Sequence, residues 1–297
     1  MKRILSSLLI LVFTCLSVIS PSIASASPSQ SYNSTQQLKQ EFEKNVDNLT
    51  VEGIKSHFID KISELKNEKA KATSPEEKDA IDKQINAYST TLTRVNKEIK
   101  TDTLEKAKIE LKQSANSTLM TSSGTLSSPT IYAAVVATIV IGSNMGYTFS
   151  ADMLNWSLSA TTNSTLDIWN TNYIVPIRIK ASSYYQQKLA SLRTAYKNGG
   201  KVNGFTADAK FSFDGKQNIV EKDMYCSIHG LTSGSVLVNN GYGELTLNDY
   251  YDFPPISPYD SFTNALNNLG RSAVDSGDCH VFYIKIHTVE SFYDYIP

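Results

Sequence analysis

The stretch SPTIYAAVVATIVIGSNMGYTFSADMLNW, Ser128 to Trp156, carries a single charged residue, Asp152, in a chain that is otherwise 19% charged. Its centre, residues 131–142, is a continuous apolar run rich in β-branched side chains. A membrane-spanning helix needs about 20 predominantly apolar residues, and here glycine and polar residues interrupt the run from Gly142 onward. The pattern therefore favours a buried core helix. A segment that enters a membrane after a conformational change or cleavage, and a pair of buried strands, remain as alternatives.

The N-terminal residues have the layout of a secretory signal peptide. Two basic residues, Lys2 and Arg3, precede an apolar run, and the small residues Ala24-Ser25-Ala26 follow it. Residues 1–26 are therefore predicted to be removed, and the remaining chain is predicted to be secreted. Taking these two from the 28 basic residues leaves an excess of about three acidic residues over basic ones. This balance argues against nucleic acid as a partner.

Residues 34–112 are predicted to form an antiparallel helical hairpin. Apolar residues recur at three- and four-residue spacing in two series, and the capping box Ser74-Pro75-Glu76-Glu77 separates them. The two series are Leu38, Phe42, Val46, Leu49, Ile54, Phe58, Ile62 and Leu65, and then Ile81, Ile85, Tyr88, Leu92, Val95 and Ile99. A short connection between two such seams allows each apolar stripe to cover the other. We interpret this hairpin as a scaffold without chemistry of its own.

The middle of the chain divides into two parts. Residues 113–130 are rich in serine and threonine and are predicted to be a flexible linker. Residues 131–200 hold the apolar segment and a further helix from Leu166 to Asn198, which the following glycines should end.

Residues 201–297 change to the two-residue period of strands, which predicts an antiparallel sheet with one short helix and an α+β fold for the whole chain. Strands are expected at 205–213, at 219–228, on both sides of the turn Asn240-Gly241 and at 279–287, and a helix at 261–276. The last strand should place Phe282, Ile284 and Ile286 on one face.

Two cysteines, Cys226 and Cys279, remain after the signal peptide. An even number in an oxidising compartment is typical of a disulfide, which we predict between them. Two buried thiols are the alternative.

The densest polar cluster surrounds Asp249, Tyr251 and Asp252. The two aspartates are candidates for a general acid/base pair or a cation site, whereas a strand end with aspartates accepting backbone hydrogen bonds is the simpler interpretation. The DxYD string resembles the lipid-carrier phosphodiesterase motif of colicin M-like bacteriocins. The histidine-arginine pair that follows in that family is replaced here by Ser257-Pro258-Tyr259. The four histidines are not spaced as a zinc site, and neither a metal nor a cofactor is expected.

The order of segments suggests a function. A signal peptide, a charged helical region and an apolar small-residue segment together resemble the layout of exported sporulation-delaying-type killing factors, in which the apolar peptide is membrane-active. The candidate membrane-active residues are Ile131, Val135, Val136, Ile139, Val140 and Ile141. The expectation is a secreted bacterial toxin or bacteriocin whose shielded apolar segment acts on a target-cell membrane. Its C-terminal module, residues 201–297, is expected to recognise a surface or receptor. A non-catalytic extracellular interaction protein with a permanent core helix is the alternative, and a hydrolase is a third.

Overall fold

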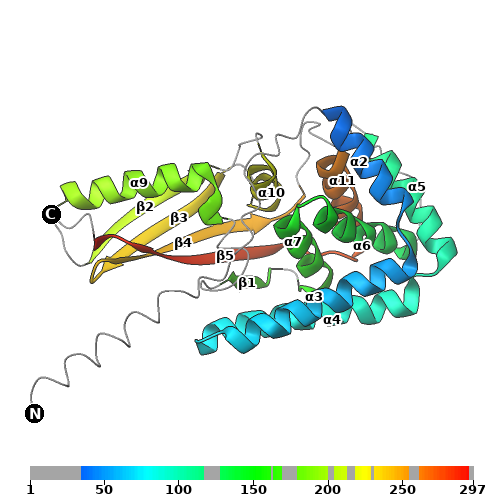
Figure 1. Cartoon of the computed structure of the whole chain (residues 1–297), viewed down its shortest axis with the longest axis horizontal. Coiled ribbons are helices and arrows are strands. Elements are labelled where there is room, and N and C mark those ends of the chain that lie inside the picture. The colour runs from blue at the N-terminus through cyan, green and yellow to red at the C-terminus, as the bar shows by residue number, and fades with distance from the viewer. Residues whose placement is uncertain are drawn as a thin grey trace, which may run out of the picture. The chain divides into compact units, whose positions relative to one another are not determined.

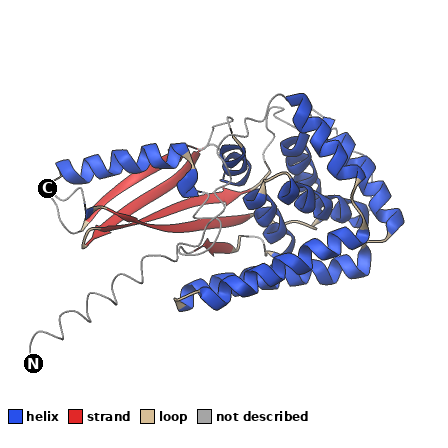
Figure 2. Ribbon diagram, in the orientation of Figure 1, coloured by secondary structure: helices blue, strands red, loops and turns tan. Residues whose placement is uncertain are grey.

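The computed structural model describes residues 35–116, 128–161, 163–168, 179–199, 204–212, 218–228, 231–253 and 261–293. All of these belong to one compact unit, residues 32–297. The described part is mostly helical and contains one mixed five-stranded sheet (Figures 1 and 2), so the predicted α+β class is confirmed. The predicted signal peptide, residues 1–26, and residues 117–127 of the predicted linker lie outside the described residues.

The region predicted as a two-helix hairpin contains four helices: α2 (Thr35–Asp47), α3 (Val51–Lys71), α4 (Pro75–Glu98) and α5 (Thr101–Asn116). Helices α3 and α4 pack against each other on either side of a short turn (Figure 1). The capping box forms there, because Glu77 N–H donates to Ser74 Oγ at 3.1 Å and Thr73 N–H donates to the Glu77 carboxylate at 3.1 Å. The break before α3 is fixed by Thr50, whose hydroxyl accepts from Gly53 N–H at 3.0 Å. The apolar spacing continues across this break, so the period alone does not reveal it.

The apolar segment forms helix α6 (Ser128–Asn144), which is followed by helix α7 (Thr148–Ser159). Every residue of α6 from Thr130 to Gly142 is buried. A Cβ atom at Gly142 would lie 2.6 Å from the ring of Phe262, so the glycine permits a close approach to that ring. The core-helix interpretation is therefore confirmed, and the alternative of a buried strand pair is wrong.

The sheet has the strand order β1-β5-β4-β3-β2. Its strands are β1 (Thr165–Ile168), β2 (Phe205–Ser212), β3 (Leu231–Asn239), β4 (Tyr242–Tyr251) and β5 (Phe282–Ser291). The strand pairs within residues 201–297 are antiparallel, as predicted. The sheet as a whole is mixed, because β1, from outside this range, runs parallel to β5. The turn between β3 and β4 is the predicted one, with positive φ angles of 49° at Asn240 and 74° at Gly241.

Three further helices are α9 (Ser183–Asn198), α10 (Ile219–Ile228) and α11 (Ser261–Ser276). Helix α10 corrects the predicted strand at 219–228. Asn218 Oδ1 accepts from Glu221 N–H at 3.0 Å, and this cap starts a helix where the apolar ends alone suggested a strand. The helix predicted from Leu166 to Asn198 is wrong at its start, because Leu166 and Ile168 are buried residues of strand β1. Its last part forms α9, and residues 169–178 lie outside the described residues.

The predicted C-terminal module is not separate from the helical part. Helix α11 packs against α5 and α6, and β1 from the middle of the chain joins β5. Helix α9 lies along the sheet and packs against β2 (Figure 2). The sheet and the helices thus share one core.

Candidate functional site

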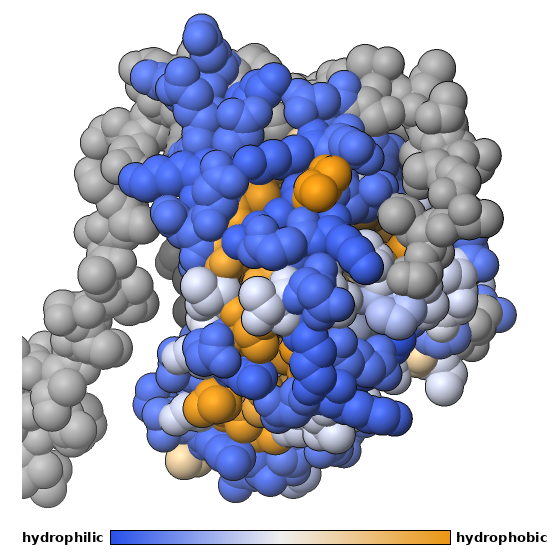
Figure 3. Space-filling view, turned by 90° about the vertical axis from the view of Figure 1, so that its right-hand side faces the viewer, coloured by the Kyte–Doolittle hydropathy of each residue, from blue (hydrophilic) through white to orange (hydrophobic). Residues whose placement is uncertain are grey.

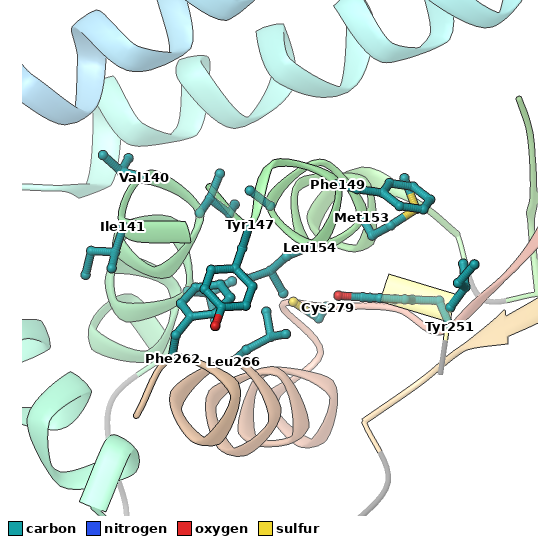
Figure 4. Packing of buried hydrophobic residues seen from close by; sticks show 14 of the residues in the cluster. Val140, Ile141, Tyr147, Phe149, Met153, Leu154, Tyr251, Phe262, Leu266 and Cys279 are labelled. Atoms are coloured by element: carbon teal, nitrogen blue, oxygen red, sulfur yellow. The ribbon is translucent and has the colours of Figure 1, made fainter. Parts of the chain in front are cut away.

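Helix α6 is enclosed by other helices. Helices α5, α7 and α11 pack along it, and α2, α3 and α4 also contact it. Its six candidate membrane-active residues, Ile131, Val135, Val136, Ile139, Val140 and Ile141, are all buried. Figure 4 shows part of this packing, with Tyr147, Phe262 and Leu266 next to the end of α6. On the face that Figure 3 draws, apolar side chains are visible as small separate groups between hydrophilic ones.

None of the helices that the structure describes combines the length and the apolar character needed to cross a membrane. The entry of α6 into a membrane after a conformational change stays a prediction.

Polar side chains attach α7 to the α3–α4 hairpin. Asp152 accepts a hydrogen bond from Tyr88 and lies 3.7 Å from Lys61 Nζ. Burial opposes the charge on Lys61, but the attraction of Asp152 and Glu64 outweighs it and raises the pKa of the ammonium group. The single charge of the apolar stretch is therefore paired inside the protein, where removing one partner is costly.

Helix α10 holds the beginnings of two other helices through its acidic side chains. The Asp223 carboxylate accepts from the backbone N–H groups of Phe149 at 3.0 Å and Ser150 at 2.8 Å, in the first turn of α7. The Glu221 carboxylate accepts from Ser183 N–H at 2.7 Å, at the start of α9. Unpaired N–H groups and the positive end of the helix dipole explain why carboxylates are favourable at both places.

The structure describes all three residues of the candidate DxYD site. Tyr251 is fully buried in the core, and Figure 4 shows its side chain near Cys279. Burial raises its pKa well above the usual value. Asp249 is half-buried on β4, and Asp252 follows the last residue of that strand. Tyr251 is thus a core residue, and a catalytic or cation site at Asp249, Tyr251 and Asp252 stays a prediction.

The predicted disulfide is not formed in the structure, because Cys226 and Cys279 are both thiols. The prediction assumed that Cys226 lies on a strand, whereas it lies on α10, with its Sγ 3.3 Å from Thr263 Oγ1. Burial raises the pKa of the Cys279 thiol to about 12, which makes it a poor nucleophile at neutral pH.

The sheet has one covered and one accessible face. On the covered face, the side chains of Val236, Val238, Leu245, Leu247, Ile284 and Ile286 are buried, as predicted for the last strand. The alternate side chains form the second face, which we call the open face: Thr206, Asp208, Ser235, Leu237, Tyr242, Glu244, Thr246, Tyr250, Tyr283, Lys285, His287 and Val289. Apart from His287, these side chains are exposed or half-buried.

The open face combines apolar and polar groups. Leu237 and Val289 flank Glu244 in one row across three strands. A hollow of about 350 Å³ lies beside this row, and Asp208, Ser235 and Thr246 contribute to its lining. Such a mixture of apolar side chains and polar groups is typical of a protein interface.

No protein-family model, curated protein or solved structure matches this chain.

His287 is the buried centre of the open face. Its Nδ1 lies 3.2 Å from Glu244 Oε1 and its Nε2 lies 3.7 Å from Asp167 Oδ1. Burial lowers the pKa of its imidazole, which favours the neutral form. Among the residues that the structure describes, no group of three histidine, cysteine or carboxylate side chains is arranged to hold a metal ion.

Sequence reasoning missed the open face as a functional candidate. The alternation along β4 indicates which residues of that strand share the open face. The residues beside them on the adjacent strands depend on strand register, which a local pattern does not reveal. The capping roles of Glu221 and Asp223 have no sequence signal, because their partners lie tens of residues away.

Proposed function

We propose that this chain is a non-catalytic extracellular binding protein, which recognises a protein on a cell surface through the open face. The proposal is supported by the positions of the exposed hydrophobic side chains. Of the seven large hydrophobic side chains that are exposed among the described residues, Leu237, Tyr242, Tyr283 and Val289 lie on the open face, and Tyr293 packs on Tyr242 with ring centroids 4.9 Å apart.

This clustering favours recognition over a merely solvated surface. Exposed apolar residues scattered singly over a surface are normal. Here four of them share one face of a sheet, with Glu244, Lys285 and His287 between them. Tyrosine side chains are suited to this role, because a large rigid surface is combined with a hydroxyl group. Tyr250 and Tyr283 form a second aromatic pair on the same face, with centroids 4.9 Å apart.

In this proposal, α6 is a permanent part of the core. The polar residues of α7 support it, because Asp152 would lose Tyr88 and Lys61 if the α6–α7 pair left the protein. Ser150 would likewise lose Asp223. Each uncompensated buried group costs about 1–3 kcal/mol or more, so these contacts oppose release.

The test is retention of fluorescently labelled protein by intact cells. The double substitution Leu237→Lys with Val289→Lys places two charges in this row and should abolish retention with an unchanged Tm, because each lysine lies opposite Glu244 and not beside a like charge. Ile59→Lys is the matched control, because Ile59 is 55% exposed on α3, away from the sheet. Equal retention of the double variant and the unsubstituted protein contradicts the proposal.

We propose a second function, membrane action of a toxin or bacteriocin type, on a different observation. Helix α6 lacks charged residues and is apolar around its whole circumference, a pattern shared by buried helices and membrane segments. A competing hydrocarbon phase is the only environment that could replace its present neighbours.

The test is dye release from liposomes by intact and protease-cleaved protein, with Val136→Asp as the inactivated form. Absence of leakage from both the intact and the cleaved protein removes this function.

A further inference from the structure

Strand β2 forms one edge of the sheet (Figure 1). Among the described residues, β3 is the only strand that pairs with it. All eight residues of β2 pair with β3 in an unbroken register, from Phe205 opposite Val238 to Ser212 opposite Leu231. The other side of β2 therefore presents a regular row of backbone N–H and C=O groups, with which a further strand can pair. We propose that this edge binds the β2 edge of a second copy of this chain, so that the two sheets join across a two-fold axis.

The two faces of β2 have different surroundings. Helix α9 packs on the covered face, where the rings of Tyr196 and Phe205 have centroids 5.5 Å apart. On the open face, the side chains of Thr206, Asp208 and Lys210 are exposed. A second strand that continues the sheet would lie beside these three exposed side chains.

The charges of β2 favour a second copy of the chain as the partner. Antiparallel strands place directly opposite side chains on the same face of the sheet. Two identical strands related by a two-fold axis meet this condition only when the pairing is centred on one residue, and not between two residues. With the centre at Ala209, Asp208 of each copy lies opposite Lys210 of the other. This arrangement forms two pairs of opposite charge, and each pair stabilises the contact between the strands.

The same two charges disfavour the alternative registers. Centring the pairing on Asp208 or on Lys210 places identical charges directly opposite each other, which is destabilising. Centring it on Ala207 pairs only residues 205–209, whereas centring it on Ala209 pairs residues 206–212. Charged residues on an edge strand normally prevent uncontrolled pairing. Here they leave one long register favourable.

The two-fold axis is perpendicular to the sheet, so both open faces lie on the same side of the joined sheet. Under the proposed function, a dimer brings two binding sites to one cell surface, which raises the overall affinity without a new contact. The self-pairing itself does not depend on that function.

The test is sedimentation equilibrium of the full chain over a range of concentrations. The expected result is a mass that rises from that of one chain to that of two chains. Asp208→Lys and Lys210→Asp each place like charges opposite each other in both pairs, so each should weaken self-association about tenfold or more. Glu52→Lys is the matched control, because it makes the same change of net charge as Asp208→Lys at an exposed position of α3. It should leave self-association unchanged.

A mixture of the two charge variants separates a lost contact from a lost fold. In an equal mixture of Asp208→Lys and Lys210→Asp, opposite charges meet again in both pairs. The mixture should therefore form a heterodimer about as tight as the unsubstituted dimer, which requires that both variants are folded.

Three results overturn the proposal. The first is the mass of a single chain at every concentration. The second is self-association that both charge variants retain, which places the contact elsewhere. The third is a pair of variants that stay single chains after mixing. The measurement involves no cell-surface partner, so its failure is distinguishable from a failure of the proposed function.

Discussion

Val136→Ala tests how tightly the core holds the apolar helix. Val136 is completely buried at the centre of α6, and α5, α7 and α11 pack around this helix. The substitution removes the equivalent of two methylene groups, which costs about 1.6 kcal/mol of transfer free energy. A residual cavity of roughly 40–50 Å³ adds about 1 kcal/mol, because the surrounding helices can collapse only partly. We expect the free energy of unfolding to fall by about 2–3 kcal/mol.

The assay is urea unfolding followed by circular dichroism, with the midpoint and slope fitted for each variant. A domain of this size should also lose roughly 5–10 °C in Tm. Thr138→Val is the control inside α6, because Thr138 is equally buried and its hydroxyl donates only to the Ala134 carbonyl, at 2.8 Å. Replacing this hydroxyl by a methyl group of similar size should change stability by less than about 1 kcal/mol. A loss below about 0.5 kcal/mol for Val136→Ala, the range of surface substitutions, would refute the reasoning.

Three further predictions follow from buried polar groups. Asp223→Asn keeps the shape of the side chain but removes the negative charge that binds the N–H groups at the start of α7. It should lower the free energy of unfolding, measured by urea titration, by about 1–3 kcal/mol. An unchanged urea midpoint contradicts this role of Asp223. In thiol labelling followed by mass spectrometry, the partly exposed Cys226 should react in the native protein, and Cys279 only after denaturation. Burial raises the pKa of the Cys279 thiol to about 12, so it is protonated and unreactive in the native state. If neither thiol reacts until a reductant is added, the two cysteines form a disulfide in solution. Burial lowers the pKa of His57 below the ordinary histidine value of about 6.5, so the unfolded chain binds a proton more readily there, and stability should fall as the pH drops below that value. His57→Gln should reduce this loss between neutral and mildly acidic pH in urea titrations, and an unaltered pH dependence would show that His57 is not its source.

Local signals predicted several elements because their causes lie within a few residues. The capping box at Ser74 and Glu77 starts a helix through contacts inside one turn. The turn at Asn240 and Gly241 needs two positive φ angles, which these residue types tolerate. Such interactions involve only residues a few positions apart, so the sequence alone indicates where they can form.

Other elements were missed because competing local patterns were ambiguous. The segment 219–228 has apolar residues at both ends, which suggested a strand, but the cap at Asn218 and the packing of α10 make it a helix. The four residues of β1 alternate in burial, yet so short a run is indistinguishable from the start of a helix. The disulfide prediction failed for the same reason, since it depended on the wrong element for Cys226.

The sequence by itself determined that residues 131–142 leave water, because transferring an uncharged apolar run out of water lowers its free energy. It left open whether the run is a core helix, a pair of buried strands or a segment that enters a membrane. Only the tertiary structure decided which helices surround α6, where Asp152 finds its partners and how Leu237 and Val289 come to flank Glu244. The physical reason is that hydrophobic burial is non-directional and follows from composition. Strand register and buried hydrogen bonds require particular atoms from distant segments to meet, and their positions are set only when the whole chain has packed.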